Sequence, residues 1–349
     1  MAVSRRELFT TLPALGALSV TRISAAGKGQ LLAANRVRFA DGATELEVQR
    51  LTDPSSASFL PAPWMRPSSS RGGFLICASD RTGTMQALRL DLRTGESRVL
   101  TEAAQLDRAS LTLAADEKSI FYFDGSALKA TSLASLRERT VAEAESPSAL
   151  TVSDDSLQAA FLSGGRLMVA NIARSGSEPI AEAPDANRVL LRPKRAAVLY
   201  RRGDALWLAS LDKQENRKLK TAPVTGTAQW SPDGRTVLYL SGLELREHTP
   251  DSNTDALIAK TSQFGDFGRN ADGSVFVGAS SSKAGPYVLL LLRISRRELA
   301  LCEHRCSDPA QVHPSFAPSS QRIYFQSDRH GKMAIYSMVV DKLVERTDT

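Results

Sequence analysis

The sequence has few of the residues on which disulfide-rich scaffolds and most metal centres depend. Its 349 residues include only three cysteines and four histidines, and aromatic residues make up 6% of the chain. Three cysteines are too few for a disulfide framework, and none stands in the paired C-x-x-C spacing of a zinc site. The chain also lacks a G-x-S-x-G elbow, a P-loop and a dinucleotide-binding fingerprint. A serine hydrolase, an NTPase and a Rossmann oxidoreductase are therefore disfavoured.

Charge and hydropathy exclude two further classes of partner. The formal net charge from 44 Lys and Arg and 38 Asp and Glu is only +6, and no run of five or six like charges occurs. No basic tract is interleaved with aromatic residues, so a nucleic-acid partner is not expected. The apolar run that starts at Leu8 and ends near Val20 is shorter than the ~20 residues needed to span a bilayer. We expect a monomer without a membrane span, and a mildly basic cleft for an acidic ligand stays open.

The N-terminus has the pattern of an export signal. Ser4-Arg5-Arg6-Glu7-Leu8-Phe9 places two adjacent arginines before the apolar run, and Ser24-Ala25-Ala26 follows with the small residues that a signal peptidase prefers. This predicts a twin-arginine signal peptide over residues 1–26 and a mature chain of 27–349 that works in the periplasm or outside the cell. The alternative is a basic first helix of the folded domain.

From Phe74 onward the sequence repeats at roughly 38 to 48 residues, the spacing of four-stranded propeller blades. Each repeat contains a short apolar run without strict alternation, which is typical of a strand buried on both faces. The seven runs are Phe74–Cys77, Ile120–Phe123, Ala159–Leu162, Ala197–Tyr200, Val237–Leu240, Val275–Gly278 and Ile323–Gln326. We predict an all-β, seven-bladed β-propeller.

Turn signals separate the expected strands. Trp230-Ser231-Pro232-Asp233-Gly234 precedes one apolar run, and Asn270-Ala271-Asp272-Gly273 precedes the next. Proline presets φ, aspartate binds its own backbone and glycine accepts a positive φ, so these residues reverse the chain. After the last run, Ser327-Asp328-Arg329-His330-Gly331 predicts a second reversal, which makes His330 a turn residue.

The ends of the mature chain predict how the ring closes. The last repeat ends near Arg346 with little left for an outer strand, whereas the strand-like segment Glu45–Thr52 has no blade of its own. Because a ring must close to remove its exposed edges, we expect this N-terminal strand to complete the last blade. Residues 53–72, rich in Ser and Pro, are expected to cross into the first blade as a loop.

Several segments together resemble the oligogalacturonate lyase family. They are Arg50-Leu51-Thr52, the Trp-Ser-Pro-Asp-Gly element, and Val312-His313-Pro314-Ser315-Phe316 with the residues that follow it to Tyr336. The family is related to TolB-type propellers and cleaves short pectic fragments by β-elimination with a manganese ion in its central funnel. The blade pattern covers most of the mature chain but is shared with many propellers. The last forty residues alone carry the resemblance to the lyase.

The resemblance implies a metal site and also shows where this chain departs from it. The family holds its ion with three histidines and a glutamine, and only one of those histidines is matched here, by His313. Gln311 falls on another histidine or, with a gap, on the glutamine itself. Asp308 falls on the glutamine without a gap, and Asp266 falls near the remaining histidine. These four residues are the candidate ligands for Mn, or for Ca or Mg, because hard ions accept carboxylate and amide oxygens. The alternative role of His313 is to line the channel and bind a backbone carbonyl.

β-Elimination from a uronate needs a positive group on the carboxylate and a base for the α-proton. The histidine base of the family falls on Thr227-Ala228, which cannot accept a proton at neutral pH, so no catalytic residue is assigned. Two functions stay open. The first is an exported lyase-like protein that cleaves or binds short uronic-acid oligosaccharides. The second is a non-catalytic, TolB-like scaffold that binds a periplasmic protein or a glycan.

A second cluster of potential ligands lies at Cys302-Glu303-His304-Arg305-Cys306. If this segment is a strand, alternate side chains face one side and could meet a metal. The alternative is a surface strand or loop that carries free or oxidised thiols.

Overall fold

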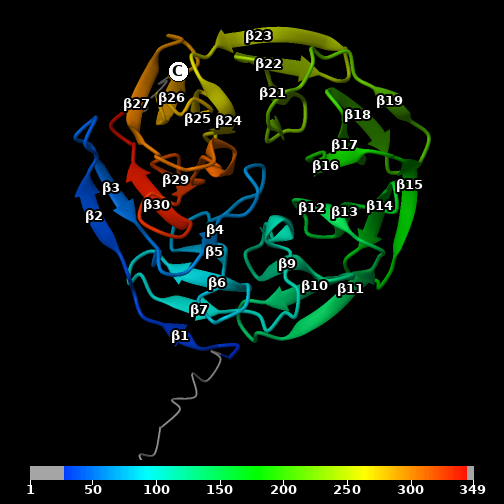
Figure 1. Cartoon of the computed structure of the whole chain (residues 1–349). Helices are drawn as coiled ribbons and strands as arrows, with labels where there is room; N and C mark the ends of the chain where they lie inside the picture. The colour runs from blue at the N-terminus through cyan, green and yellow to red at the C-terminus, as the bar shows by residue number, and fades with distance from the viewer. Residues whose placement is uncertain (1–26, 344–349) are drawn as a thin grey trace, which may run out of the picture.

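The chain forms a closed ring of seven β-sheets around a central channel (Figure 1). The computed structural model describes residues 27–343. The predicted signal segment, residues 1–26, therefore lies outside the described residues. Two short 3-10 turns, η1 (Arg108–Ser110) and η2 (Pro309–Gln311), interrupt an otherwise all-β chain. Between residues 27 and 343 no helix is long and apolar enough to cross a membrane. The prediction of a seven-bladed propeller is confirmed.

Each blade begins with the strand that lines the channel and continues outward by antiparallel pairing. The innermost strands are β4 (Ser58–Phe59), β8 (Thr112–Leu113), β12 (Ser148–Val152), β16 (Ala186–Leu191), β20 (Ala228–Trp230), β24 (Phe264–Arg269) and β28 (Ser315–Phe316). The second strands are β5 (Phe74–Ser79), β9 (Ser119–Asp124), β13 (Gln158–Ser163), β17 (Ala197–Arg202), β21 (Val237–Ser241), β25 (Val275–Ser280) and β29 (Arg322–Ser327).

The third and fourth strands complete the blades toward the rim. The third strands are β6 (Gln86–Asp91), β10 (Ala127–Ser132), β14 (Arg166–Asn171), β18 (Ala205–Ser210), β22 (Glu244–Thr249), β26 (Tyr287–Leu292) and β30 (Ala334–Val339). The fourth strands are β7 (Ser97–Val99), β11 (Glu138–Glu143), β15 (Ser177–Glu182), β19 (Asn216–Lys218), β23 (Thr254–Lys260), β27 (Glu298–Glu303) and β3 (Glu47–Arg50).

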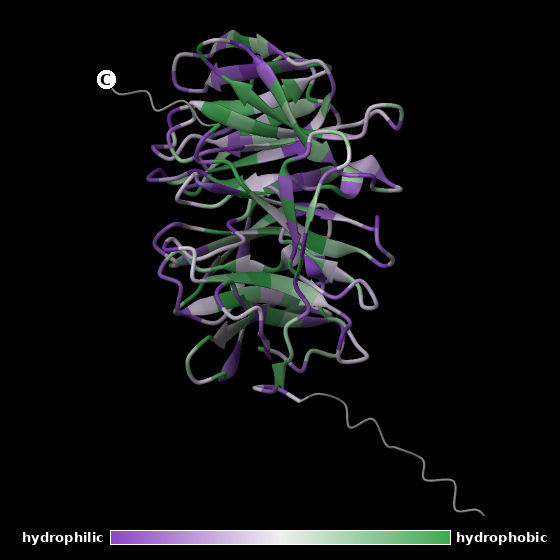
Figure 2. Ribbon diagram, turned by 90° about the vertical axis from the view of Figure 1, so that its left-hand side faces the viewer, coloured by the Kyte–Doolittle hydropathy of each residue, from purple (hydrophilic) through white to green (hydrophobic). Residues whose placement is uncertain are grey.

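All seven apolar runs of the sequence lie in second strands, and their burial explains why they do not alternate. In β5 and β25 every residue is buried. The apolar clusters lie between neighbouring sheets, and one of them joins Ile76 of the first blade to Leu113 and Tyr122 of the second. Both faces of each second strand therefore contact apolar side chains, and Figure 2 shows apolar colour along the strands inside the blades.

The ring closes as the sequence predicts, with an N-terminal strand in the last blade. In β3, Gln49 pairs with Ser337 and Arg50 pairs with Tyr336 of β30. The contact continues beyond the strand, where the Leu51 amide donates to the Ile335 carbonyl at 2.7 Å. The first and last parts of the described chain thus form one sheet.

Three short strands were not foreseen. β1 (Leu31–Leu32) adds a fifth strand to the first blade, and β2 (Val37–Ala40) adds one to the last. The interpretation of residues 53–72 as a loop was wrong at β4 (Ser58–Phe59), which is the innermost strand of the first blade. A two-residue strand is too short to show any alternation, so no pattern could reveal it.

After β4, residues 60–67 leave the blade and enter the channel; we call them the channel segment. Figure 1 shows this blue loop reaching into the centre of the ring. Trp64 packs against the apolar cluster shared by the fourth and fifth blades. On the way back, Arg66 forms an ion pair with Glu117 of the second blade at 2.7 Å. The channel segment therefore contacts the second, fourth and fifth blades from inside the ring.

Closure by β3 should be a large part of the stability. Val48, fully buried in β3, packs in the cluster that joins the sixth and seventh blades. We expect Val48→Ala to lower the free energy of unfolding by about 2 kcal/mol, because it leaves a cavity at the seam. The control is Val37→Ala on β2, where the side chain is 44% exposed and the effect should stay within about 0.5 kcal/mol. Urea denaturation measures both, and equal effects would mean that the seam adds little.

Candidate functional site

The channel has two mouths, and the direction of the innermost strands defines them. We call the end at which these strands begin the leading mouth, and the end at which they finish the trailing mouth. His313 stands just before β28, Arg108 just before β8 and Thr227 just before β20, so all three lie at the leading mouth. Asp154 and Pro232 follow β12 and β20, so they lie at the trailing mouth.

His313 lies at the leading mouth with a strained backbone. Its φ of 48° lies in the left-handed region, which residues other than glycine adopt at an energetic cost. Its Nδ1 atom is buried and has no hydrogen-bond partner in the described part of the chain. Burial, with Arg188 and Arg108 nearby, lowers the pKa of the imidazole to about 4. At Nδ1, therefore, His313 does not form the hydrogen bond to a backbone carbonyl that its alternative role requires. With a pKa of about 4, its ring is neutral at pH 7.

Asp266 reaches the same mouth from β24 and is bound to protein groups. Its Oδ1 accepts hydrogen bonds from the Thr227 hydroxyl and, at 2.9 Å, from the Phe267 amide. Burial raises the pKa of the carboxyl to about 6, although the Thr227 bond and the Arg188 charge lower it. The side chain is half-buried, and near pH 6 it changes from neutral to charged.

Asp308 and Gln311 contact each other, and neither forms a hydrogen bond with Asp266. Asp308 caps η2 by accepting from the Ala310 amide, and the Gln311 side-chain amide donates to its other oxygen at 3.0 Å. The Gln311 carbonyl in turn accepts from Gln326 at 2.6 Å. These bonds fix η2, while the Asp308 side chain is exposed at its end.

The four candidate ligands do not form a set that fits manganese. Asp308 and Gln311 satisfy each other, and Asp266 is satisfied by Thr227. In the part of the chain that the structure describes, no three His, Cys, Asp or Glu side chains are placed to hold one ion. His313 alone offers an unpartnered nitrogen, but the Arg108 and Arg188 charges that depress its pKa also repel a cation. The site therefore lacks the convergent donors that a divalent ion needs, and two guanidinium groups oppose its charge.

Two arginines that the sequence did not single out lie near His313. The Arg108 guanidinium lies 3.6 Å from the centre of the Phe59 ring and the Arg188 guanidinium lies 4.6 Å from the centre of the Trp64 ring. Arg188 also donates to the Gly226 carbonyl and the Thr227 hydroxyl, each at 3.3 Å. Arg108 forms no side-chain hydrogen bond to any residue between 27 and 343 and is exposed. Each cation is thus positioned by an aromatic face and keeps donors for a ligand.

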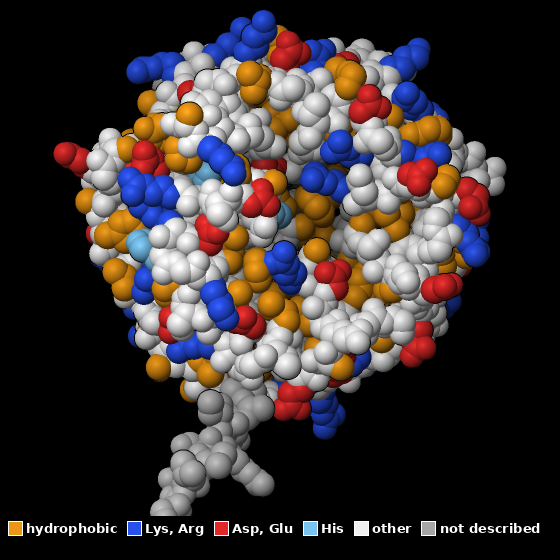
Figure 3. Space-filling model, in the orientation of Figure 1, with side chains coloured by type: hydrophobic (Ala, Val, Ile, Leu, Met, Phe, Trp, Pro, Cys, Tyr) orange, Lys and Arg blue, Asp and Glu red, His pale blue; other side chains and the backbone are white. Residues whose placement is uncertain are grey.

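The leading mouth is therefore a hollow with positive charge at its edge. Figure 3 shows the centre of this face as a hollow with apolar side chains in its depth, and with basic, acidic and histidine side chains around it. Gly268 of β24 helps to bring the walls together, because a Cβ there would stand 2.8 Å from the Pro314 carbonyl oxygen. Such a site can bind carboxylates through charge-assisted hydrogen bonds from guanidinium groups.

The cluster at 302–306 is structural. Cys302 lies on β27 and is fully buried, and Cys306 is 6% exposed; both thiols are free. His304 is buried and forms bonds at both ring nitrogens, one with the Ser280 carbonyl at 3.2 Å and one from the Cys306 amide at 3.0 Å. Burial raises the pKa of both thiols, so neither is a reactive thiolate. The expectation that His330 is a turn residue is confirmed, and its Nδ1 lies 2.8 Å from the Tyr336 hydroxyl.

Comparison with known proteins shows the fold and not the activity. The sequence matches no family model, and no curated protein is similar to it at a significant level. Among solved structures, an oligogalacturonate lyase in complex with manganese has 22% identity and a TM-score of 0.82 over 89% of this chain and 98% of its own. An oligogalacturonate lyase from Vibrio parahaemolyticus has 21% identity and a TM-score of 0.84 over 91% and 100%.

A more distant likeness shows how widely the architecture is used. Hydrazine synthase of Kuenenia stuttgartiensis has 12% identity and a TM-score of 0.58 over 79% of this chain and 95% of that one. The chain has the seven-bladed propeller fold of the two oligogalacturonate lyases. At these identities the likeness shows the fold alone, so function must be argued from the site.

The donor set leads to a prediction about metal. We expect titration with manganese chloride, followed by calorimetry, to give no stoichiometric binding, since the donors do not converge and two guanidiniums repel the ion. His313→Ala should behave like the wild type. One tightly bound manganese per chain that disappears in His313→Ala would show that the four candidate ligands do assemble.

Proposed function

We propose that this protein binds short uronic-acid oligosaccharides at the leading mouth without a metal ion. The observation that carries the proposal is the pair Arg108 and Arg188, each positioned on an aromatic ring beside His313. In a uronate the carboxylate is the charged group, and a guanidinium binds it in a planar, bidentate manner. Two such groups at one mouth suit a ligand that carries more than one carboxylate.

The surroundings of the arginines support a sugar ligand. The Phe59 and Trp64 rings restrict the two guanidiniums, so little side-chain entropy remains to be lost on binding. The unpartnered Nδ1 of His313 adds a neutral group that hydrogen-bonds a hydroxyl. The mouth thus combines two guanidinium groups for the carboxylates of the ligand with a neutral ring nitrogen for its hydroxyls.

We propose binding without cleavage because no residue at the expected position can act as the catalytic base. β-Elimination requires a group that removes the α-proton. The positions that match the family's histidine base are Thr227 and Ala228, and the Thr227 hydroxyl is bonded to Asp266. Asp266 itself already accepts from Thr227 and Phe267. The proposal is therefore a lyase-like propeller whose catalysis has degenerated.

The N-terminal pattern supports a function outside the cytoplasm. A twin-arginine signal, as expected over residues 1–26, directs a folded protein to the periplasm. Export and the pectic origin of the ligand are part of the proposal and rest on the sequence and on the likeness to oligogalacturonate lyases.

Removing either arginine should weaken binding of trigalacturonate. We expect Arg108→Ala and Arg188→Gln each to raise the dissociation constant about tenfold, equivalent to roughly 1.4 kcal/mol, through loss of a charge-assisted hydrogen bond. Isothermal titration calorimetry measures the effect. Arg108→Ala is the cleaner variant because this exposed side chain forms no hydrogen bond with the described protein.

The matched control is Arg89→Ala on β6, where the guanidinium lies 4.4 Å from the centre of the Phe74 ring outside the channel. Its affinity should equal that of the wild type. Equal losses in Arg89→Ala and Arg108→Ala would point to a general loss of charge and against this site. Unsaturated product, detected by its absorbance, would contradict binding without cleavage.

The affinity should also fall as the pH rises through about 6. Asp266 is mostly neutral at pH 5, and its ionisation by pH 7 places a negative charge beside Arg188. Uronate carboxylates are already ionised across this range, and His313, with a pKa of about 4, stays neutral. We expect a loss of roughly threefold between pH 5 and pH 7, about 0.6 kcal/mol. In Asp266→Asn the affinity should be independent of pH, and a persisting slope would assign it to another group.

A further inference from the structure

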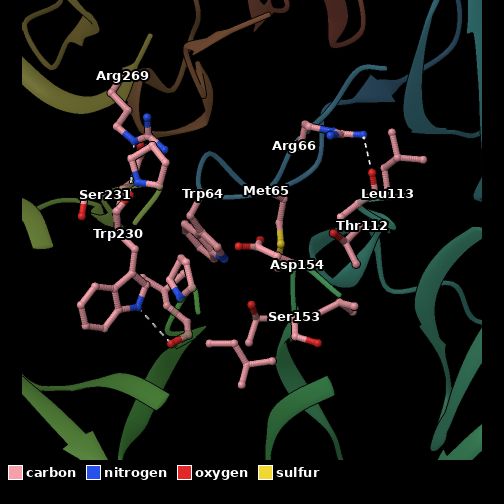
Figure 4. Close-up of a pocket in the computed structure, with 18 residues that line it drawn as sticks. Trp64, Met65, Arg66, Thr112, Leu113, Ser153, Asp154, Trp230, Ser231 and Arg269 are labelled. Carbon is pink, nitrogen blue, oxygen red and sulfur yellow. Dashed lines mark hydrogen bonds between the residues drawn. The ribbon is translucent and has the colours of Figure 1, made fainter. Parts of the chain in front are cut away.

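The trailing mouth contains a second cavity, separate from the site proposed above. It has a volume of about 330 Å³, within the range of small-ligand sites. Its walls come from the channel segment and from the ends of innermost strands in the second to sixth blades. Figure 4 shows Trp64 and Met65 of the channel segment in the middle of this cavity, with Asp154 beside them.

Trp64 separates the cavity from the leading mouth. The Arg188 guanidinium lies 4.6 Å from the centre of the Trp64 ring, and Trp64, unlike Arg188, lines the trailing cavity. Trp230 also lines the cavity but is engaged with protein, since its Nε1 donates to the Leu190 carbonyl at 3.3 Å. The Nε1 donor of Trp64, in contrast, is buried and has no partner within residues 27–343.

Other polar groups in the cavity wall are also unpaired. The carboxylate of Asp154 and the hydroxyls of Thr112 and Thr151 make no hydrogen bond to any described residue, and all three line the cavity. With the Trp64 N–H they provide one donor, one carboxyl group and two hydroxyls that both donate and accept. Met65 and Leu191 add apolar surface to the same wall. This mixture is typical of a ligand with several hydroxyl groups and an apolar ring face.

The charged side chains around the cavity favour a neutral ligand. Arg66 is paired with Glu117 at 2.7 Å, and Arg269 donates to the Trp230, Asn270 and Ala271 carbonyls at 3.0–3.2 Å. These cations already have protein partners, and they disfavour a cationic ligand. The Asp154 carboxyl lies near the charges of Arg66 and Arg269, so the cavity offers no excess of positive charge to an anionic ligand.

We propose that the trailing cavity is a binding site for a neutral saccharide, distinct from the uronate site at the leading mouth. The sugar accepts a hydrogen bond from Trp64 Nε1, donates a hydroxyl to Asp154, and exchanges further bonds with Thr112 and Thr151. The apolar wall covers its ring face.

The three tryptophans of the chain make binding measurable. Trp64 and Trp230 line the cavity, whereas Trp207 does not. We expect D-glucose, D-galactose or N-acetylglucosamine, tested up to ~50 mM to detect a millimolar dissociation constant, to change the intrinsic fluorescence. The change should persist in Trp207→Phe. Glucuronate, which has the same ring with a carboxylate, should bind at least fivefold more weakly than glucose.

Two variants test the assigned groups by calorimetry. Trp64→Phe removes the N–H donor and keeps an aromatic ring, and Thr151→Val removes a hydroxyl at nearly constant shape. Each should weaken sugar binding by at least threefold, with unchanged circular dichroism. If Trp64→Phe does not fold, Thr151→Val still decides the matter.

Three results would overturn the proposal. They are no response to any of the neutral sugars, wild-type affinity in Thr151→Val, or equal binding of glucose and glucuronate. Arg108→Ala should leave sugar binding unchanged, so failure of the uronate proposal and failure of this one are distinguishable.

Discussion

The structure depends on one seam, the pairing of β3 with β30. Two residue pairs and the adjoining Leu51–Ile335 bond join the start of the described chain to its end. Without that seam the last blade would end at β30 with an exposed edge, and the ring would not be closed by its N-terminal strand. The seam also fixes where the chain enters the first blade, because β4 and the channel segment follow directly after it. Both mouths are therefore consequences of closure.

The fold was predictable because it repeats. The same four-stranded unit recurs along the chain, marked by seven buried runs at similar spacing and by turn signals such as Trp230-Ser231-Pro232-Asp233-Gly234. A wrong interpretation of one repeat therefore leaves the predicted fold unchanged. The closing strand was predictable from the missing outer strand of the last blade. The short strands β1, β2 and β4 were not, since pairing with a neighbour defines them and two to four residues carry no period.

The candidate site was much less predictable than the fold. Position in the chain correctly placed His313 at the channel, but the metal ligands inferred by resemblance satisfy one another or Thr227. Arg108 and Arg188 carry no motif and stand in different blades, and their relation to His313 exists only in three dimensions. Their aromatic partners, Phe59 and Trp64, lie in the segment that the sequence describes merely as rich in Ser and Pro. A solitary arginine in a sequence with 44 basic residues gives no signal of its own.

The indole of Trp64 has a consequence that neither mouth shows alone. It contacts the guanidinium of Arg188 on one side and lines the cavity on the other. A ligand at one mouth that shifts this ring would alter the surface presented to the other mouth. By thermodynamic linkage, each ligand would then change the affinity for the other by the same factor. One side chain that borders two binding sites is sufficient, in principle, for such coupling.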